Sequence, residues 1–366
     1  MKKVGIISCF WSDNYGAVLQ AVALAYKIRE LGFQPLYVNY IQSPNIKGRK
    51  LLFNKAYFFL QFILGYRKRN IRTEEFRKQY LPLTNKVKKY EELENIVIDL
   101  DFFILGSDQM WNPRTLGVKN GYYLLEFVKL KPKISYATSF GVSSLPTSLI
   151  LRYKKALESF LSLSVRERTG QVILSGLNLK SDVVLDPTLL LTKTEWASFF
   201  SPKSFIQSDY ILCYVMSGDH KSANFIWKYA KLINMRCFQG KKSIVILGDK
   251  EYKRFKPLYN LICNAGPSEF LNLISNSCYV VTNSFHGTCF SINFEKKFTT
   301  ILDRENVLNS RIIDLLTDLS LLDTIKYTDM KEEDYSLAKI DYVAVDNRLK
   351  FLRKNSLEYL KNKMKI

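Results

Sequence analysis

The chain alternates short apolar runs with helix-like segments, and this alternation restricts its fold more than any other feature. Residues 3–8 have the pattern of a buried strand, residues 17–31 carry apolar side chains at helical spacing before Gly32, and residues 35–40 resemble a second strand. A strand–helix–strand opening is typical of a parallel sheet covered by helices. The sequence therefore predicts an α/β protein.

The alternation occurs twice along the chain. Further strands are expected at residues 102–105, 134–137, 162–165 and 183–185, with helices at 148–160 and 169–175. After a polar connector the pattern restarts, with strands at 210–216, 243–247 and 279–282 and helices at 220–233, 269–275 and 288–293. Two Rossmann-like domains in tandem are expected to form a cleft where the carboxyl ends of both sheets face each other.

These patterns divide the 366 residues into three parts. Residues 1–187 are predicted to form an N-terminal Rossmann-like domain and residues 188–340 a C-terminal one. Residues 341–366 are expected to form a basic helix that packs back across the junction.

The sequence gives no sign of export, of membrane spanning or of a metal site. It has no apolar run long enough to cross a bilayer, and its N-terminus lacks the core and cleavage site of a signal peptide. The six cysteines lack metal-ligand spacing and are interpreted as buried, reduced thiols. We therefore expect a cytoplasmic protein without a bound metal.

Positive charge is concentrated in one part of the chain. The formal net charge is +20, and residues 47–89 alone hold 13 basic and 2 acidic residues. Within this window, residues 47–80 form an excursion from the strand–helix pattern, in which an aromatic segment, 51–64, is flanked by basic residues. Such a segment fits a helix on an anionic membrane surface, and it fits equally a buried helical excursion with a solvated basic end. Nucleic-acid binding is not expected, because none of its usual motifs is present.

His286 is expected where a strand ends and a helix begins. Asn283 or Ser284 can cap that helix, and Gly287 would let a ligand approach the backbone closely. The free N–H groups and the positive dipole end of a helix attract anions, and phosphate fits this arrangement. The alternative is a histidine that is merely packed at a turn.

Two more polar clusters follow predicted strands. After the strand at 102–105, Asp108 could accept a proton from a hydroxyl, and Trp111 offers a flat apolar face that suits a sugar ring. Asp108 could instead cap the following helix. Arg166 ends another predicted strand, and its planar guanidinium suits a bidentate grip on carboxylate or phosphate.

Seven short motifs follow one another from residue 14 to residue 287. They are Asn14-Tyr15-Gly16, GSDQMWN at Gly106–Asn112, SYATSFG at Ser135–Gly141, SVRE at Ser164–Glu167, Asp186-Pro187-Thr188, GPSEF at Gly266–Phe270 and NSFHG at Asn283–Gly287. In these motifs and their order the chain resembles the polysaccharide pyruvyl transferase family. Residues 47–80 and the C-terminal tail lie outside the resemblance.

The resemblance implies two Rossmann-like domains in a GT-B-like arrangement, with the active site in the inter-domain cleft. It also implies transfer of pyruvate from phosphoenolpyruvate to a sugar diol of a surface polysaccharide or its lipid-linked precursor. The product would be a cyclic ketal, released together with phosphate. Phosphoenolpyruvate is a substrate in this scheme, so no cofactor is expected.

The resemblance also implies roles for individual residues. Arg166 would hold a carboxylate or phosphate oxygen of the donor, and His286 would bind the donor phosphate or act as general acid. From the residues themselves we expect Asp108 to act as base. We further expect Asn283, Ser284 and Gly287 to bind the donor and Asn14, Tyr15 and Trp111 to bind the acceptor. Many relatives carry an arginine two residues before the histidine, where this chain has Ser284. A donor-binding cation is therefore missing or comes from elsewhere.

The rival activity is that of a GT-B-type glycosyltransferase, in which the helix after residue 284 would bind the diphosphate of a nucleotide sugar. The basic window and a lipid-linked acceptor together suggest peripheral binding at the inner face of the plasma membrane.

Overall fold

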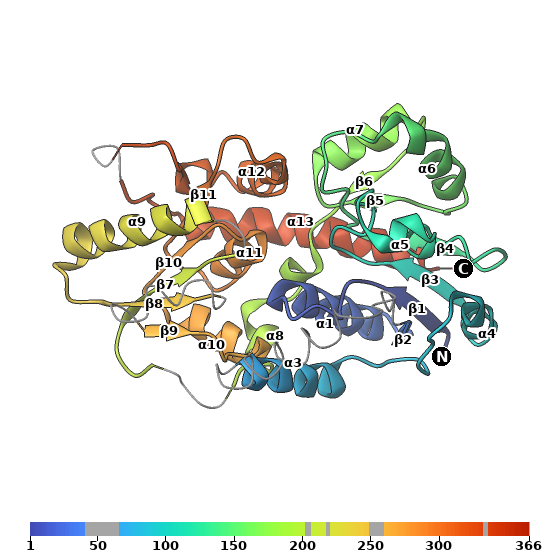
Figure 1. Ribbon diagram of the computed structural model, residues 1–366, viewed down its shortest axis with the longest axis horizontal. Helices are drawn as coiled ribbons and strands as arrows, with labels where there is room; N and C mark the ends of the chain where they lie inside the picture. Colours follow the sequence, from blue (N-terminus) through green and yellow to red (C-terminus); the bar gives the residue numbers. More distant parts are fainter. Residues whose placement is uncertain (41–65, 202–205, 217–219, 249–259, 332–335, 366) are drawn as a thin grey trace, which may run out of the picture. The chain divides into compact units, whose positions relative to one another are not determined.

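The computed structural model describes residues 1–40, 66–201, 206–216, 220–248, 260–331 and 336–365 (Figure 1). Of these, residues 1–40, 77–190 and 350–365 form one compact unit, called unit 1, and the others form a second, called unit 2. The aromatic segment 51–64 lies outside the described residues.

This division differs from the predicted one in three places. The first unit extends to Leu190 instead of residue 187. Residues 66–76 belong to unit 2, although the excursion was assigned to the first domain. From Lys350 onward the chain returns to unit 1.

Unit 1 is built on a parallel sheet with the strand order β2-β1-β3-β4. Its strands are β1 (Lys3–Ile7), β2 (Gln34–Tyr37), β3 (Phe102–Leu105) and β4 (Lys133–Ser135). All four residues of β3 are buried, as expected for a parallel strand covered on both faces. Unit 1 also contains a separate two-stranded parallel sheet formed by β5 (Ser164–Val165) and β6 (Asp182–Val183).

Helix α1 (Tyr15–Glu30) connects β1 to β2, and its ends follow from the sequence. The side chain of Asn14 accepts hydrogen bonds from the N–H groups of Gly16 and Ala17, so it caps the first turn. After the helix, Gly32 has a φ of +87°, a left-handed conformation that glycine adopts without strain. The other helices of unit 1 are α4 (Leu93–Ile98), α5 (Leu116–Lys119), α6 (Ile150–Leu157) and α7 (Arg168–Gly176).

Unit 2 contains a six-stranded parallel sheet with the order β12-β11-β10-β7-β8-β9. The strands are β7 (Tyr210–Tyr214), β8 (Ser243–Leu247), β9 (Asn260–Ile262), β10 (Tyr279–Thr282), β11 (Phe298–Leu302) and β12 (Ile325–Tyr327). The helices are α8 (Lys193–Ala197), α9 (His220–Phe238), α10 (Pro267–Asn276), α11 (Phe285–Asn293) and α12 (Ser310–Asp318). The predicted α/β class with two Rossmann-like sheets is confirmed.

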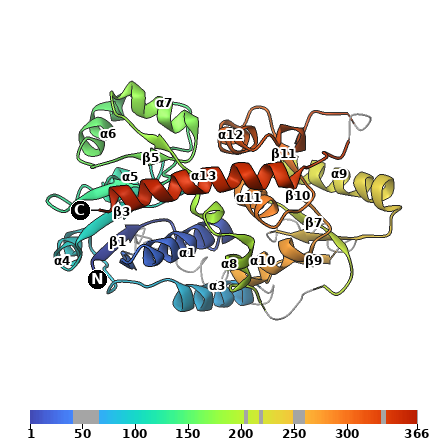
Figure 2. The same ribbon diagram turned by 180° about the vertical axis from the view of Figure 1, so that it is seen from behind.

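Helix α13 (Tyr342–Lys363) confirms the predicted C-terminal helix and runs as one continuous element (Figure 2). Its first residues belong to unit 2, where the hydroxyl of Tyr342 donates to the backbone oxygen of Lys296. From Lys350 onward the helix belongs to unit 1. There the hydroxyl of Ser356 accepts from the N–H of Leu185, and the hydroxyl of Tyr359 donates to the oxygen of Ser135.

The basic helix α3 (Tyr66–Tyr80) uses two of its arginines to hold the protein's own backbone. Arg72 donates to the oxygen of Asn264 at 2.7 Å and pairs with Glu269 at 3.4 Å. Arg77 donates to two backbone oxygens of the loop after β1. Lys68 and Lys78 are exposed. These contacts show that part of the basic window has a structural role, and the membrane hypothesis remains a prediction.

None of the helices in the described part of the chain is both long enough and apolar enough to cross a membrane.

Candidate functional site

In the described residues, the four-stranded sheet of unit 1 and the six-stranded sheet of unit 2 each have one point where the strand order reverses. In unit 1 the chain goes from β1 outward to β2 and then returns to place β3 on the other side of β1. In unit 2 it goes from β7 to β8 and β9 and then returns to β10 beside β7. Ligands of open α/β sheets bind beyond the carboxyl ends of the strands at such switch points, because the two loops diverge there and leave a crevice. The predicted clusters around Asp108 and His286 follow β3 and β10, so each lies at the switch point of its unit.

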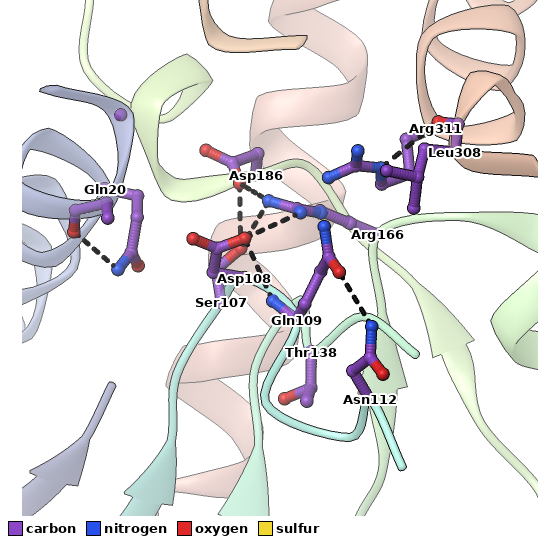
Figure 3. A network of polar contacts seen from close by, with 12 residues as sticks. Gln20, Ser107, Asp108, Gln109, Asn112, Thr138, Arg166, Asp186, Leu308 and Arg311 are labelled. Carbon is purple, nitrogen blue, oxygen red and sulfur yellow. Dashed lines mark hydrogen bonds and ion pairs between the residues drawn. The ribbon is translucent and has the colours of Figure 1, made fainter. Parts of the chain in front are cut away.

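In unit 1, Arg166 lies in a buried network of ionic groups (Figure 3). Its guanidinium donates to the carboxylate of Asp186 at 2.9 Å and to that of Asp108 at 3.1 Å. Glu167 lies 3.7 Å from its Nε. The hydroxyl of Ser107 also donates to Asp186, at 2.8 Å. The side chains of Arg166 and Asp186 are fully buried.

The electrostatics of this network are dominated by its three carboxylates. Burial alone would lower the pKa of the Arg166 guanidinium, but the charges of Asp108, Asp186 and Glu167 outweigh it and raise that pKa above its usual value. Arg166 is therefore held as a cation by groups of its own chain. The predicted grip on the donor is wrong for this conformation, because no part of the Arg166 side chain reaches the surface.

Asp108 is the member of the network that reaches solvent, with 20% of its side chain exposed. Its backbone has a φ of +83°, a left-handed conformation that aspartate tolerates better than most residues. The backbone oxygen of Asp108 accepts from the N–H groups of Met110 and Ser139, which holds the turn in this shape. The fixed turn, together with Arg166, orients the Asp108 carboxylate, so its proposed role as a base stays a prediction with suitable geometry.

Two neighbouring side chains respond to the charge of Asp108. Burial, followed by this charge, raises the pKa of the Cys9 thiol to about 12. Burial also raises the pKa of the Tyr123 hydroxyl, and the charges of Cys9 and Asp108 add to that rise. Cys9, which comes shortly after β1, therefore lies close to Asp108, as the adjacency of β1 and β3 requires.

The predicted sugar-stacking role of Trp111 is wrong. Trp111 is fully buried in the core of unit 1. Its ring centroid lies 5.1 Å from that of Phe140, and its backbone oxygen accepts from the hydroxyl of Tyr153. The sequence could not separate the two roles, because a tryptophan after a buried strand is equally suited to a core and to a binding surface.

The two predicted acceptor residues of the first loop have structural roles. Asn14 caps helix α1, as described above. Tyr15 is 2% exposed, so its ring offers no face to a sugar. The prediction that Tyr15 contacts the acceptor is therefore wrong in this conformation, and that for Asn14 remains untested.

In unit 2, the start of α11 has the geometry that the sequence predicted. Ser284 is the N-cap, and its hydroxyl accepts from the N–H of Gly287 at 3.2 Å. The side-chain oxygen of Asn283 accepts from the N–H of Met216 at 2.9 Å. This bond joins the loop after β10 to the loop after β7, directly across the switch point.

Packing inside unit 2 leaves no room for a side chain at Gly287. A Cβ atom at this position would lie 2.5 Å from the hydroxyl oxygen of Thr282 and 2.9 Å from the ring of Tyr214. Such distances are too short for real side chains. Gly287 therefore lets α11 pack closely on β10 and β7, and the approach of a ligand to its backbone stays a prediction.

His286 is 7% exposed and lies in the first turn of α11. Its ring meets that of Phe285 edge to face, with centroids 5.2 Å apart. The guanidinium of Arg311 lies over the same Phe285 ring, 5.6 Å from its centroid. Arg311 belongs to the first turn of α12, and its Nε donates to the backbone oxygen of Leu308.

Arg311 is not among the site residues predicted from the sequence. It follows His286 by 25 residues and belongs to a helix that the sequence analysis did not predict. A signal existed in the apolar spacing of Ile312, Leu315 and Leu316, the buried residues of α12. That signal predicts the helix and says nothing of a contact with Phe285.

The overall fold is shared with several solved sugar-nucleotide enzymes. An S. aureus MnaA structure with UDP has a TM-score of 0.52 at 12% identity and covers 100% of this chain and 90% of its own. A putative UDP-N-acetylglucosamine 2-epimerase from Listeria monocytogenes has a TM-score of 0.52 at 10% identity, covering 99% and 90%. UDP-GlcNAc 2-epimerase from Neisseria meningitidis has a TM-score of 0.50 at 11% identity, covering 100% and 94%. At these identities the similarity shows the fold alone. No curated protein matches the chain.

The two parallel sheets and the polar groups at their switch points are those of an α/β enzyme. Residues 14–304 match the family model of the polysaccharide pyruvyl transferases. The chain belongs to this family and is a transferase.

Proposed function

We propose that this transferase moves pyruvate from phosphoenolpyruvate to a diol of a sugar and releases phosphate. The acceptor we propose is a surface polysaccharide or its lipid-linked precursor. The observation that carries the proposal is the group of residues around the start of α11, where His286 and the Arg311 guanidinium contact the same aromatic ring. A helix start, an imidazole and a guanidinium together suit a small, highly charged anion.

The donor needs such a site because it carries both a phosphate and a carboxylate. In the proposed reaction a proton adds to the methylene carbon of phosphoenolpyruvate, and the adjacent carbon becomes cationic. One sugar hydroxyl attacks that carbon and loses its proton, the carbon–oxygen bond to phosphate breaks, and the second hydroxyl closes the ketal ring and loses its proton. One of the two hydroxyl protons balances the proton gained by carbon, and the other leaves with phosphate.

The residues divide between these tasks. Arg311 and the N–H groups of α11 bind the donor anion, in place of the buried Arg166. His286 supplies a proton to the donor, since imidazole is the side chain best suited to proton transfer near neutral pH. Asp108, oriented by Arg166, accepts the proton of the sugar hydroxyl. In this proposal the donor is served by positive groups and the acceptor by a carboxylate.

The proposal is tested by following both products. Phosphate release is measured by phosphorus NMR, and the ketal methyl group by carbon NMR from phosphoenolpyruvate labelled at its methylene carbon. In deuterated water the methyl group should carry one deuterium. His286→Gln should lower turnover by about a hundredfold or more while the far-ultraviolet circular dichroism stays unchanged. If His286→Gln turns over at the rate of the parent protein, the imidazole takes no part in the reaction.

Thermal shifts separate this activity from sugar-nucleotide transfer. A ligand that binds only the folded state raises the melting temperature. Phosphoenolpyruvate should therefore raise it, and Arg311→Met should abolish the shift. If UDP-GlcNAc raises the melting temperature and phosphoenolpyruvate does not, the protein uses a nucleotide sugar and the proposed donor is wrong.

A further inference from the structure

The loop after β1 in unit 1 presents an aromatic ring that none of the roles above uses. Trp11 is 37% exposed, whereas its neighbours Phe10 and Tyr15 are 1% and 2% exposed. The loop follows β1 at the switch point of unit 1, and Asp108 follows β3 at the same edge of the sheet. Trp11 is thus an exposed aromatic ring at the edge where ligands of this fold bind.

The ring of Trp11 packs against Phe10, which packs against Tyr37. Its centroid lies 4.3 Å from that of Phe10, at an interplanar angle of 34°. Phe10 in turn meets Tyr37 edge to face at 5.1 Å. Tyr37 is a fully buried residue of β2, and its hydroxyl donates to the backbone oxygen of Ala21. The exposed indole therefore rests on the core of unit 1.

The backbone of the same loop is clamped by one arginine. Arg77 donates from one nitrogen to the backbone oxygens of Phe10, at 3.0 Å, and Trp11, at 2.8 Å. Its second terminal nitrogen lies 3.4 Å from the Asp13 carboxylate. Arg77 is 8% exposed, so this clamp is buried. The loop is held in one shape before any ligand arrives, which lowers the entropic cost of binding.

The surroundings of the ring favour a sugar over a protein partner. Ser12, Asp13 and Asn14 follow Trp11, and the Asp13 side chain is 44% exposed. A protein interface needs a contiguous apolar patch, whereas here one aromatic ring stands beside hydroxyl, carboxylate and amide groups. A pyranose ring has the matching chemistry. Its C–H face is attracted to the negative face of an indole, and its hydroxyls donate to carboxylates.

We propose that Trp11 and Asp13 form the binding platform for the acceptor sugar. The pyranose stacks on the exposed face of Trp11, and one of its hydroxyls donates to Asp13. This inference rests on the proposed function for the identity of the ligand class. It replaces the buried Trp111 with another aromatic residue of the same unit.

The platform is tested by binding alone, without phosphoenolpyruvate. The probes are the methyl glycosides of galactose, glucose and mannose, and the signal is intrinsic tryptophan fluorescence. Of the four tryptophans, Trp111 and Trp196 are fully buried, so Trp11 and Trp227 are the ones that solvent reaches. At least one glycoside should change the emission in a saturable way. Trp11→Phe should remove that change, and the matched control Trp227→Phe should keep it.

Turnover supplies the second readout. Trp11→Ala should raise the KM for the glycoside acceptor about three- to tenfold, with the KM for phosphoenolpyruvate unchanged, because one aromatic contact is lost. Trp11→Tyr should restore most of the loss. Asp13→Asn should lower the affinity for the same glycoside, as measured by the fluorescence assay.

Three results would overturn the platform. The first is a saturable fluorescence change that survives in Trp11→Phe, and the second is no change with any of the three glycosides. The third is a Trp11 signal that responds to anionic phospholipid vesicles and to no sugar, which would make the ring a membrane contact. A glycoside that binds through Trp11 without any pyruvyl transfer would instead leave the platform in place and refute the proposed function.

Discussion

Units 1 and 2 each place an arginine near the switch point of a parallel sheet, and they use it in different ways. In unit 1 the side chain of Arg166 is fully buried among carboxylates of its own chain. In unit 2 the guanidinium of Arg311 lies over an aromatic ring at the start of a helix. An arginine near the end of a strand therefore does not by itself identify an anion site. What surrounds the guanidinium decides whether it holds the fold or holds a ligand.

The two switch points also differ in charge. In unit 1, three carboxylates, those of Asp108, Asp186 and Glu167, lie around the guanidinium of Arg166. In unit 2, the groups that fix α11 are the uncharged side chains of Asn283 and Ser284. An acidic cluster suits a hydroxyl that must lose a proton, and an uncharged helix start beside an arginine suits an anion. The difference is the physical basis for proposing that Asp108 serves the acceptor hydroxyl and that the start of α11 serves the donor anion.

The largest expected effect concerns the stability of unit 1. Arg166→Met should lower the free energy of unfolding by about 3–5 kcal/mol, because it leaves three carboxylates without their cation. Urea denaturation followed by circular dichroism measures the effect. Arg311→Met, the same substitution in unit 2, should leave the midpoint nearly unchanged. Equal urea midpoints for the two variants would contradict the view that Arg166 stabilises the fold and that Arg311 does not.

The next effect concerns the donor. Arg311→Met should raise the KM for phosphoenolpyruvate about tenfold or more, since a hydrogen bond to a charged group is worth about 1.5–3 kcal/mol. Steady-state phosphate release measures it. Arg304→Met is the matched control, because Arg304 lies on the segment between β11 and α12 and pairs with Asp329 at the surface. If both variants lose the same affinity, the effect reflects the general charge of unit 2.

Another effect concerns pH and is confined to unit 1. Lys133 is 4% exposed, and burial lowers the pKa of its ammonium group from 10.5 to about 8. Between these two values the unfolded chain keeps a proton that the folded chain has released, so stability should rise with pH from about 8 to 10.5. Urea midpoints across this range measure the rise. Lys133→Met should flatten it, and an equally steep rise in that variant would assign it to other groups.

A separate effect concerns the basic helix α3. If it lies on an anionic membrane, Lys68→Gln with Lys78→Gln should weaken vesicle binding by about fivefold per lysine, at roughly 1 kcal/mol each. Co-sedimentation at low salt measures it, with Lys361→Gln and Lys363→Gln as a control of equal charge. Arg72 and Arg77 are left intact because they hold backbone oxygens. A parent protein that never sediments would refute the membrane hypothesis.

Much of the fold could be predicted from the sequence because the strands are apolar runs. The ranges predicted for β3, β8 and β10 agree with the structure to the residue. Strand β11 escaped prediction because Thr299 and Thr300 interrupt its apolar run. Both are fully buried, and their hydroxyls share hydrogen bonds with Tyr279 and Thr288. A pattern of apolar residues cannot show that a hydroxyl will find such a partner.

The candidate site was predictable in position and not in detail. The order of strands and loops placed Asp108 and His286 beyond the carboxyl ends of their sheets. Whether a side chain there turns inward depends on contacts with distant parts of the chain. Arg166 meets a carboxylate 58 residues away, and no local pattern reports such a contact. The same reason explains why the sequence predicted a sugar-binding role for Trp111, which is buried.

Helix α13 has a consequence for the order in which the protein matures. Its last turns complete unit 1, where Ser356 and Tyr359 bond to Leu185 and Ser135. On the ribosome these turns emerge only after all of unit 2 has been made. The unit whose synthesis begins first is thus finished last, because Leu185 and Ser135 gain their α13 partners only after unit 2 has been made.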